Sequence, residues 1–263
     1  MRYGKISVLF WTLMPLSVVL RLLQLIFTVD TKTGFFLREY EKMGNIMLIA
    51  TFIFAFAAAV FPFFSHRNPE HPPKINIFLT VTSVALAFSV LLELFTETFP
   101  ITVQWWLILA LRVTGLASAA FFALFGIGGI AGIKIPNICS AIPVIYLIIR
   151  VVCDFTAISA LALISDNLIL MESYCSCLWF MLNFAKLYNG IDTERNFKKL
   201  MSSAMLAVIF CFTQSIPHII MNFATNNAYL HTSFQVNLNI LLMGIFILTF
   251  MLSHFSRHNA CEN

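Results

Sequence analysis

The segment IYLIIRVVCDF (residues 145–155) places Arg150 inside an otherwise largely apolar run. The two other segments of this form are VVLRLLQLIF, at residues 18–27 around Arg21, and LILALRVTGLA, at residues 107–117 around Arg112. Such runs are typical of helices in lipid, where a charged side chain at bilayer depth costs about 2.5–3.5 kcal/mol. We therefore expect the three arginines to face the inside of a helical bundle, where partners or water can satisfy them.

The composition places the chain among multi-pass membrane proteins. Hydrophobic residues make up 60% of the sequence and charged residues 11%, with a mean hydropathy of +0.88. A soluble domain carries roughly 25% charged residues, because its surface must be solvated. The sequence thus predicts an all-α, polytopic transmembrane bundle whose main partner is the lipid bilayer. The net charge of +4 does not indicate nucleic-acid binding, since the basic residues fall around the apolar runs.

Apolar runs long enough to cross the hydrocarbon need about 20 residues, and the chain contains eight of them. The predicted spans lie near residues 6–28, 43–64, 75–95, 101–125, 137–162, 167–188, 200–222 and 233–255. Turn-forming or charged sequences such as SHRNPEHPPK (65–74) and NGIDTERNFKK (189–199) separate them. The break at 163–166 has the weakest turn signal, so a count of seven stays open. No segment is polar enough for a soluble module, which predicts one membrane domain over residues 1–263.

The distribution of lysine and arginine predicts the orientation. With the N-terminus in the cytoplasm, only Lys32, Arg38 and Lys42 lie outside. The cytoplasmic set is Arg2, Lys5, Arg67, Lys74, Lys134, Lys186, Arg195, Lys198, Lys199 and Arg257. This asymmetry favours an even number of spans with both termini in the cytoplasm.

Polar residues within the spans gather in the predicted outer half. The candidates for ligand binding or for a buried ion pair are Arg21, Arg112, Arg150, Asp154, Glu172, Gln214 and His218. Arg150 and Asp154 are the strongest pair, because residues four apart share a helix face. They form either a structural ion pair or part of a cavity open to the outside. Three arginines against two deeper acids, Asp154 and Glu172, leave a positive surplus that favours an anionic group, unless Glu93 balances it.

The residues for other chemistries are missing or badly spaced. The six cysteines form no CxxC motif, so we expect small apolar packing and no metal site. His218 lies beside Pro217 and is either a proton carrier or a packed residue at a helix kink. No nucleophile–base set or cofactor motif is recognisable, which predicts a protein without a cofactor and without enzymatic activity. Gly126 and the glycines after it indicate close helix approach or a hairpin, not a nucleotide-binding loop.

The stretch PVIYLIIRVVCDFTAISALALISDNLILMESYCSCLWFMLNFAK (143–186) is similar to a recurrent segment of uncharacterised multi-pass membrane proteins from Gram-positive bacteria. The similarity lies in the apolar spacing around Arg150, Phe155, Asn167 and Phe184. It implies a location in the bacterial cytoplasmic membrane and implies no activity.

Two functional hypotheses follow. The first is a transporter for a small polar or anionic solute, with its site in the outer half of the bundle. The second is a non-catalytic membrane component, namely a sensor, an assembly factor or a partner subunit of another transporter.

Overall fold

The computed structural model describes residues 3–30, 35–64, 76–97, 99–100, 103–132, 136–158, 165–191, 193–224 and 233–260. These residues form eight α-helices and two short 3-10 helices. The α-helices are α1 (Tyr3–Phe27), α2 (Glu41–Val60), α3 (Ile77–Thr96), α4 (Trp105–Ala131), α5 (Ile142–Ile158), α6 (Ser165–Tyr188), α7 (Thr193–Ala224) and α8 (Phe234–Ala260). The 3-10 helices are η1 (Phe61–Phe64) and η2 (Asn137–Ala141).

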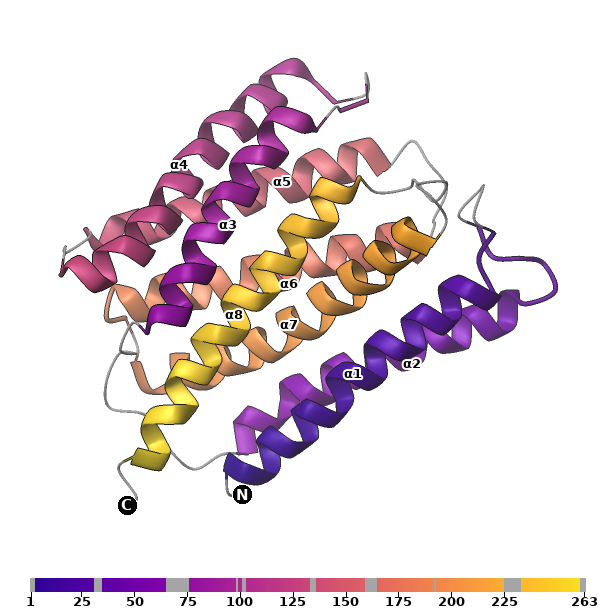
Figure 1. The fold of residues 1–263 in the computed structure, drawn as a ribbon, viewed down its shortest axis with the longest axis horizontal. Helices are drawn as coiled ribbons and strands as arrows, with labels where there is room; N and C mark the ends of the chain where they lie inside the picture. Colours follow the sequence, from indigo (N-terminus) through magenta and orange to yellow (C-terminus); the bar gives the residue numbers. More distant parts are fainter. Residues whose placement is uncertain are drawn as a thin grey trace.

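All eight α-helices are long and apolar enough to cross a membrane, which confirms the predicted bundle. Separate helices α5 and α6 stand on the two sides of the weakest predicted break, so the described residues contain eight candidate spans and not seven. The first and last helices bring both chain ends to the same end of the bundle (Figure 1). We call the opposite end, where α1, α3, α5 and α7 finish, the distal end.

Several boundaries differ from the prediction by a few residues. Helix α7 begins at Thr193, inside the segment 189–199 that was expected to be a connector. The fourth span runs from Trp105 to Gly129 and so lies about four residues later than predicted. Charged residues had marked the start of α7 as loop, although they lie in the helix where it leaves the apolar layer. Gly126 and the glycines after it had marked the end of the fourth span, although helix α4 continues through them to Ala131.

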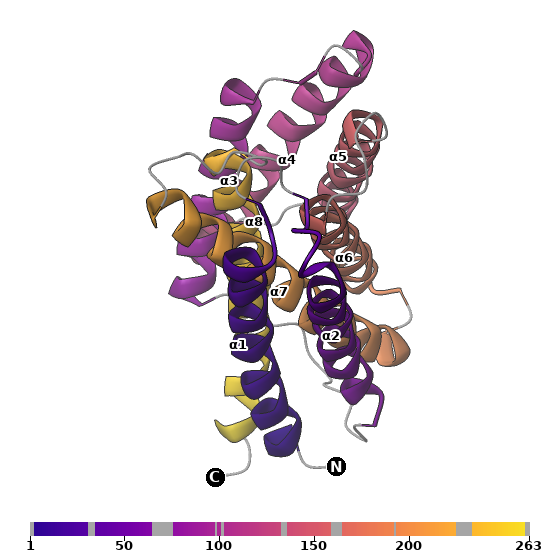
Figure 2. The same cartoon turned by 90° about the vertical axis from the view of Figure 1, so that its right-hand side faces the viewer.

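Helix α7 is the centre of the bundle, with 83% of its most apolar stretch buried, against 28% for α1 and for α2. It packs against α1, α2, α6 and α8. The α1–α2 hairpin covers one side of α7, while α3 and α4 lie beyond α8 on the other side (Figures 1 and 2).

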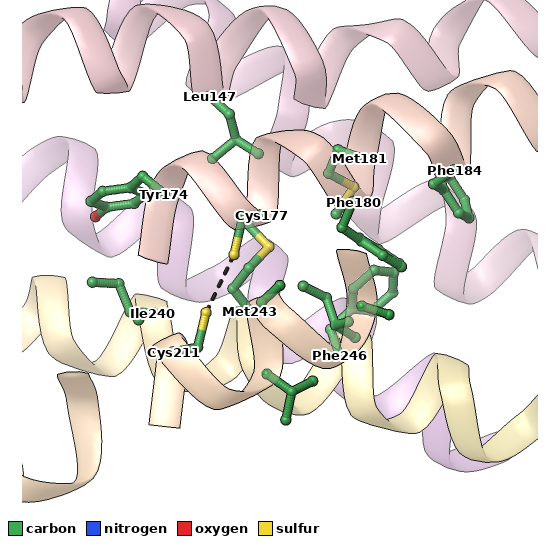
Figure 3. Packing of buried hydrophobic residues seen from close by; sticks show 14 of the residues in the cluster. Leu147, Tyr174, Cys177, Phe180, Met181, Phe184, Cys211, Ile240, Met243 and Phe246 are labelled. Atoms are coloured by element: carbon green, nitrogen blue, oxygen red, sulfur yellow. Dashed lines mark hydrogen bonds between the residues drawn. The ribbon is translucent and has the colours of Figure 1, made fainter. Parts of the chain in front are cut away.

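Aromatic rings and small side chains fill the core. Phe180 and Phe184 of α6 meet Phe250 of α8 edge to face, with ring centroids 5.6 and 5.4 Å apart. The Cys177 and Cys211 sulfurs lie 3.3 Å apart in this core (Figure 3). These buried thiols therefore act as small packing residues, as the sequence predicted.

Close helix contacts require glycine at two buried positions. A Cβ at Gly126 of α4 would lie 3.0 Å from the Thr80 carbonyl oxygen of α3. A Cβ at Gly244 of α8 would lie 2.9 Å from the Cys211 Cβ of α7. The predicted close approach at Gly126 is thus confirmed.

Candidate functional site: two buried polar clusters

Two separate clusters of buried polar side chains lie in the distal half of the bundle. The Arg21 cluster comprises Arg21, Gln24, Asp166, Gln214 and His218 on helices α1, α6 and α7. The Arg150 cluster comprises Glu93, Glu97, Arg150, Asp154, Tyr174 and Asn239 from α3 and the residue after it, α5, α6 and α8.

A fully buried ion pair forms the centre of the Arg21 cluster. The Arg21 guanidinium donates through Nη2 to the Asp166 carboxylate, and neither side chain is exposed. Its Nη1 donates to Gln24 Oε1, and Gln24 Nε2 donates to the Gly44 carbonyl oxygen of α2 at 2.7 Å. The pair therefore connects α1 to α6 directly and to α2 through Gln24.

Helix α7 supplies the third wall of this cluster. His218 Nε2 lies 3.7 Å from Asp166 Oδ1, and Gln214 precedes it by one turn on the same helix face. Gln214 is fully buried, yet neither atom of its amide has a hydrogen-bond partner among the described residues. The Arg21 Nε and the hydroxyl of Ser165, next to Asp166, also lack one. The Arg21 cluster thus contains buried hydrogen-bond donors and acceptors that no described residue satisfies.

The Arg21 cluster lies well below the distal ends of two of its helices. Arg21 and His218 each stand six residues before the last residue of α1 and α7, which is roughly 9 Å along a helix. Asp166, by contrast, is the second residue of α6. The amino end of α6, with its positive dipole, therefore begins inside the bundle at the level of the ion pair.

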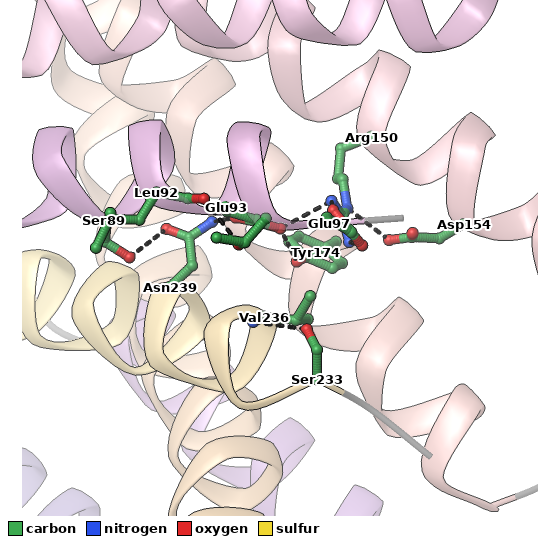
Figure 4. A network of polar contacts seen from close by, with 11 residues as sticks. Ser89, Leu92, Glu93, Glu97, Arg150, Asp154, Tyr174, Ser233, Val236 and Asn239 are labelled. Atoms are coloured by element: carbon green, nitrogen blue, oxygen red, sulfur yellow. Dashed lines mark hydrogen bonds and ion pairs between the residues drawn. The ribbon is translucent and has the colours of Figure 1, made fainter. Parts of the chain in front are cut away.

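The Arg150 cluster joins one guanidinium to three carboxylates (Figure 4). Arg150 Nε donates to Asp154 Oδ2 at 2.9 Å, which confirms the predicted pair one turn apart. Its Nη2 donates to Glu97 Oε1 at 2.6 Å, and its Nη1 lies 2.8 Å from Glu93 Oε1. The guanidinium carbon also lies 5.1 Å from the centroid of the Tyr174 ring.

Glu93 is the innermost acid of this cluster. The exposed side-chain fraction falls from 14% at Glu97 and 8% at Asp154 to 0% at Glu93. Asn239 of α8 donates to Glu93 through Nδ2, and the Tyr174 hydroxyl lies 3.4 Å from it. The carboxylate of Glu93 is therefore held by three neighbouring helices.

The positive surplus that was expected unless Glu93 balanced it does not exist inside the bundle, and Glu93 is one of the balancing acids. Arg21 is matched by Asp166, and Arg150 by three acids. The sequence argument failed because it counted only the acids within the predicted spans. Glu97 and Asp166 lay just outside those spans.

Two of the predicted residues belong to neither cluster. Arg112 is exposed on the outer surface of α4 and forms no ion pair with a described residue, contrary to the expectation that it faces inward. Glu172 is half-buried on α6, and no ion pair to it occurs within the described ranges. The other five, Arg21, Arg150, Asp154, Gln214 and His218, lie in the two clusters.

The acids that sequence reasoning missed are long-range partners. Asp166 comes from α6 to Arg21, and Glu97 comes from the end of α3 to Arg150. In the sequence, each of them is recognisable only as an acidic residue close to the distal end of a predicted span. That position is equally compatible with full solvation.

The fold and the two clusters define a polytopic helical membrane protein with ion pairs inside its bundle. Comparisons with protein-family models, with curated proteins and with solved structures gave no match to this chain.

Proposed function

We propose that this protein is a transporter for small polar solutes in the bacterial cytoplasmic membrane, with the Arg21 cluster as its binding site. The observation that carries the proposal is the amide of Gln214, which is buried one turn from His218 and has no hydrogen-bond partner among the residues that the structure describes.

Buried polar groups are nearly always hydrogen-bonded, because an unsatisfied one costs about 1–3 kcal/mol. The Gln214 amide offers both a donor and an acceptor, and Arg21 Nε offers a further donor. A polar solute entering between α1, α6 and α7 supplies the missing partners. Binding of the solute removes the cost of burying these unsatisfied groups, and this gain contributes to the binding free energy.

The charge balance of the Arg21 cluster favours an uncharged or zwitterionic solute. Arg21 and Asp166 neutralise each other when His218 is neutral. A zwitterion can place its negative group near Arg21 and its positive group near Asp166. A purely anionic solute must compete with Asp166 for Arg21 and bring a second negative charge next to that carboxylate, which is costly at this depth.

Uptake into proteoliposomes tests the proposal. We would measure three radiolabelled panels in parallel: zwitterionic amino acids, polyols and dicarboxylates. Uptake of a member of the first two panels is expected. The informative variant is Gln214→Leu, which removes the unpartnered amide at similar volume. It should abolish that uptake while leaving the melting temperature unchanged or higher.

Thr213→Val is the matched control for Gln214→Leu. The Thr213 hydroxyl is also buried and unpartnered among the described residues, but its side chain points to a different face of α7. This variant should retain full uptake. Absence of uptake for all three panels, or equal uptake by the wild type and Gln214→Leu, would contradict the proposal.

The alternative hypothesis of a non-catalytic partner subunit has support from the Arg150 cluster. All three guanidinium nitrogens of Arg150 are engaged by acids of the same chain, as in a network that only fixes helix packing. Purification in a mild detergent separates the two functions. A companion protein at fixed stoichiometry supports the partner subunit, and a lone chain that binds solute supports the transporter.

A further inference from the structure

Of the three arginines within the predicted spans, Arg112 is the one that does not face the interior of the bundle. It lies on the exposed face of α4 and lines a surface pocket of about 320 Å³. The other residues of the pocket are Leu94 and Phe95 of α3 with Val113 and Leu116 of α4. Within the described part of the chain no carboxylate pairs with this guanidinium. The pocket thus combines an unpaired positive charge with apolar walls.

The register of α3 against α4 fixes the depth of Arg112. These two helices are antiparallel, and a Cβ at Gly115 would lie 2.8 Å from the Leu94 side chain. Three residues further toward the distal end, Arg112 on α4 stands level with Glu97, where α3 has already ended. Arg112 therefore lies level with the distal end of α3 and seven residues, roughly 10 Å, inside the start of α4.

Residues typical of a lipid–water interface stand about two helix turns distal of Arg112, and a long arginine side chain can extend toward that level. Trp105 and Trp106 begin α4 beyond the end of α3 and are 76% and 53% exposed, as residues of an interfacial aromatic belt are. Phe95, in the last turn of α3, is 82% exposed. Aromatic rings at headgroup level with apolar residues below them are the arrangement that a bound lipid requires.

We propose that the Arg112 pocket binds the anionic headgroup of a membrane phospholipid in the distal leaflet. The guanidinium donates to the headgroup phosphate, a geometry that arginine is suited to provide. The start of an acyl chain lies against Leu94, Val113 and Leu116. The interfacial level toward which this side chain extends favours a phosphate over the acid of a partner's helix, because phosphates are concentrated there. This proposal is independent of the transport function.

Native mass spectrometry of the delipidated, detergent-purified protein tests the site. The probes are phosphatidylglycerol and phosphatidylcholine with identical acyl chains, titrated separately. Arg112→Gln should weaken phosphatidylglycerol binding about fivefold, the factor for one basic residue at a membrane surface, and change phosphatidylcholine binding little. Arg112→Lys should retain most of the affinity. Arg38→Gln, which removes another exposed arginine near the distal end, should have no effect.

A second variant tests the apolar part of the pocket. Val113→Trp fills the space beside the guanidinium and should lower the affinity for both lipids, while leaving the melting temperature unchanged because the side chain is exposed. Equal phosphatidylglycerol affinity in the wild type and Arg112→Gln would overturn the proposal. So would the loss of a dimer or of a bound protein chain in Arg112→Gln, since that result assigns Arg112 to a protein contact.

Discussion

Arg150 on α5 and Glu93 on α3 form a buried ion pair, with 2.8 Å between Nη1 and Oε1. The same guanidinium bonds Glu97 and Asp154, so three acids share one positive charge. Removing a charge from such a group has opposite consequences for the two signs. Loss of the guanidinium leaves like charges buried together, whereas loss of one peripheral carboxylate relieves their repulsion.

We therefore expect Arg150→Met to destabilise the protein by about 3–5 kcal/mol, the usual effect of removing one partner of a buried pair. Glu97→Gln should change stability by about 1 kcal/mol or less, because a glutamine oxygen can still accept from Arg150 and Glu97 is the most exposed of the three acids. Unfolding of the wild type and the two variants in detergent micelles measures both changes in stability. Equal destabilisation by the two variants would contradict the asymmetry.

The Arg21–Asp166 pair lends itself to a double-mutant cycle, since its partners come from α1 and α6. Arg21→Gln and Asp166→Asn should each destabilise the protein, because each removes one partner of a buried ion pair. The double variant should be less destabilised than the two losses added together, by about 2 kcal/mol. Unfolding of all four proteins in one detergent gives the coupling energy. A coupling near zero would mean that the two groups do not interact in the membrane protein.

The contact between Arg150 and Asp154 could be predicted from their spacing in the sequence. The contact between Arg21 and Asp166 depends on how distant helices pack. Arg150 and Asp154 could be paired from the sequence because four residues make one helix turn. Asp166 could not be assigned to Arg21, since no periodicity relates α1 to α6. The orientation of Arg112 could not be predicted either. Because α4 is apolar on nearly every face, its sequence does not indicate whether an arginine points toward the bundle interior or toward the lipid.

The spans themselves could be predicted, because the length of the apolar runs follows from the thickness of the membrane. Their ends were less predictable where charged residues continue the helix. Thr193 begins α7 inside a charged stretch that resembles a loop. Glu97, just beyond α3, resembles a solvated end and is in fact turned toward Arg150.

Gly126 and Gly244 give a prediction about helix packing. An added methyl group at Gly126 meets a backbone carbonyl oxygen at 3.0 Å, and one at Gly244 meets the Cys211 Cβ at 2.9 Å. Gly126→Ala and Gly244→Ala should each cost about 1–3 kcal/mol through overpacking. Gly129→Ala, at an exposed position of α4, should be neutral or slightly stabilising, because alanine favours helix. A milder effect at Gly126 than at Gly129 in thermal unfolding would contradict the close approach.

The side of the membrane that the two clusters face can be determined by cysteine labelling in a cysteine-free variant. Glu39→Cys lies between α1 and α2 at the distal end, and Ile191→Cys lies between α6 and α7 at the opposite end; both positions are exposed. Because the lysines and arginines lie predominantly on the side of the termini, we expect a membrane-impermeant maleimide to label Glu39→Cys in intact cells. Ile191→Cys should react only after permeabilisation. The reverse pattern would place the distal end in the cytoplasm, and the Arg21 cluster would then receive its solute from the inside.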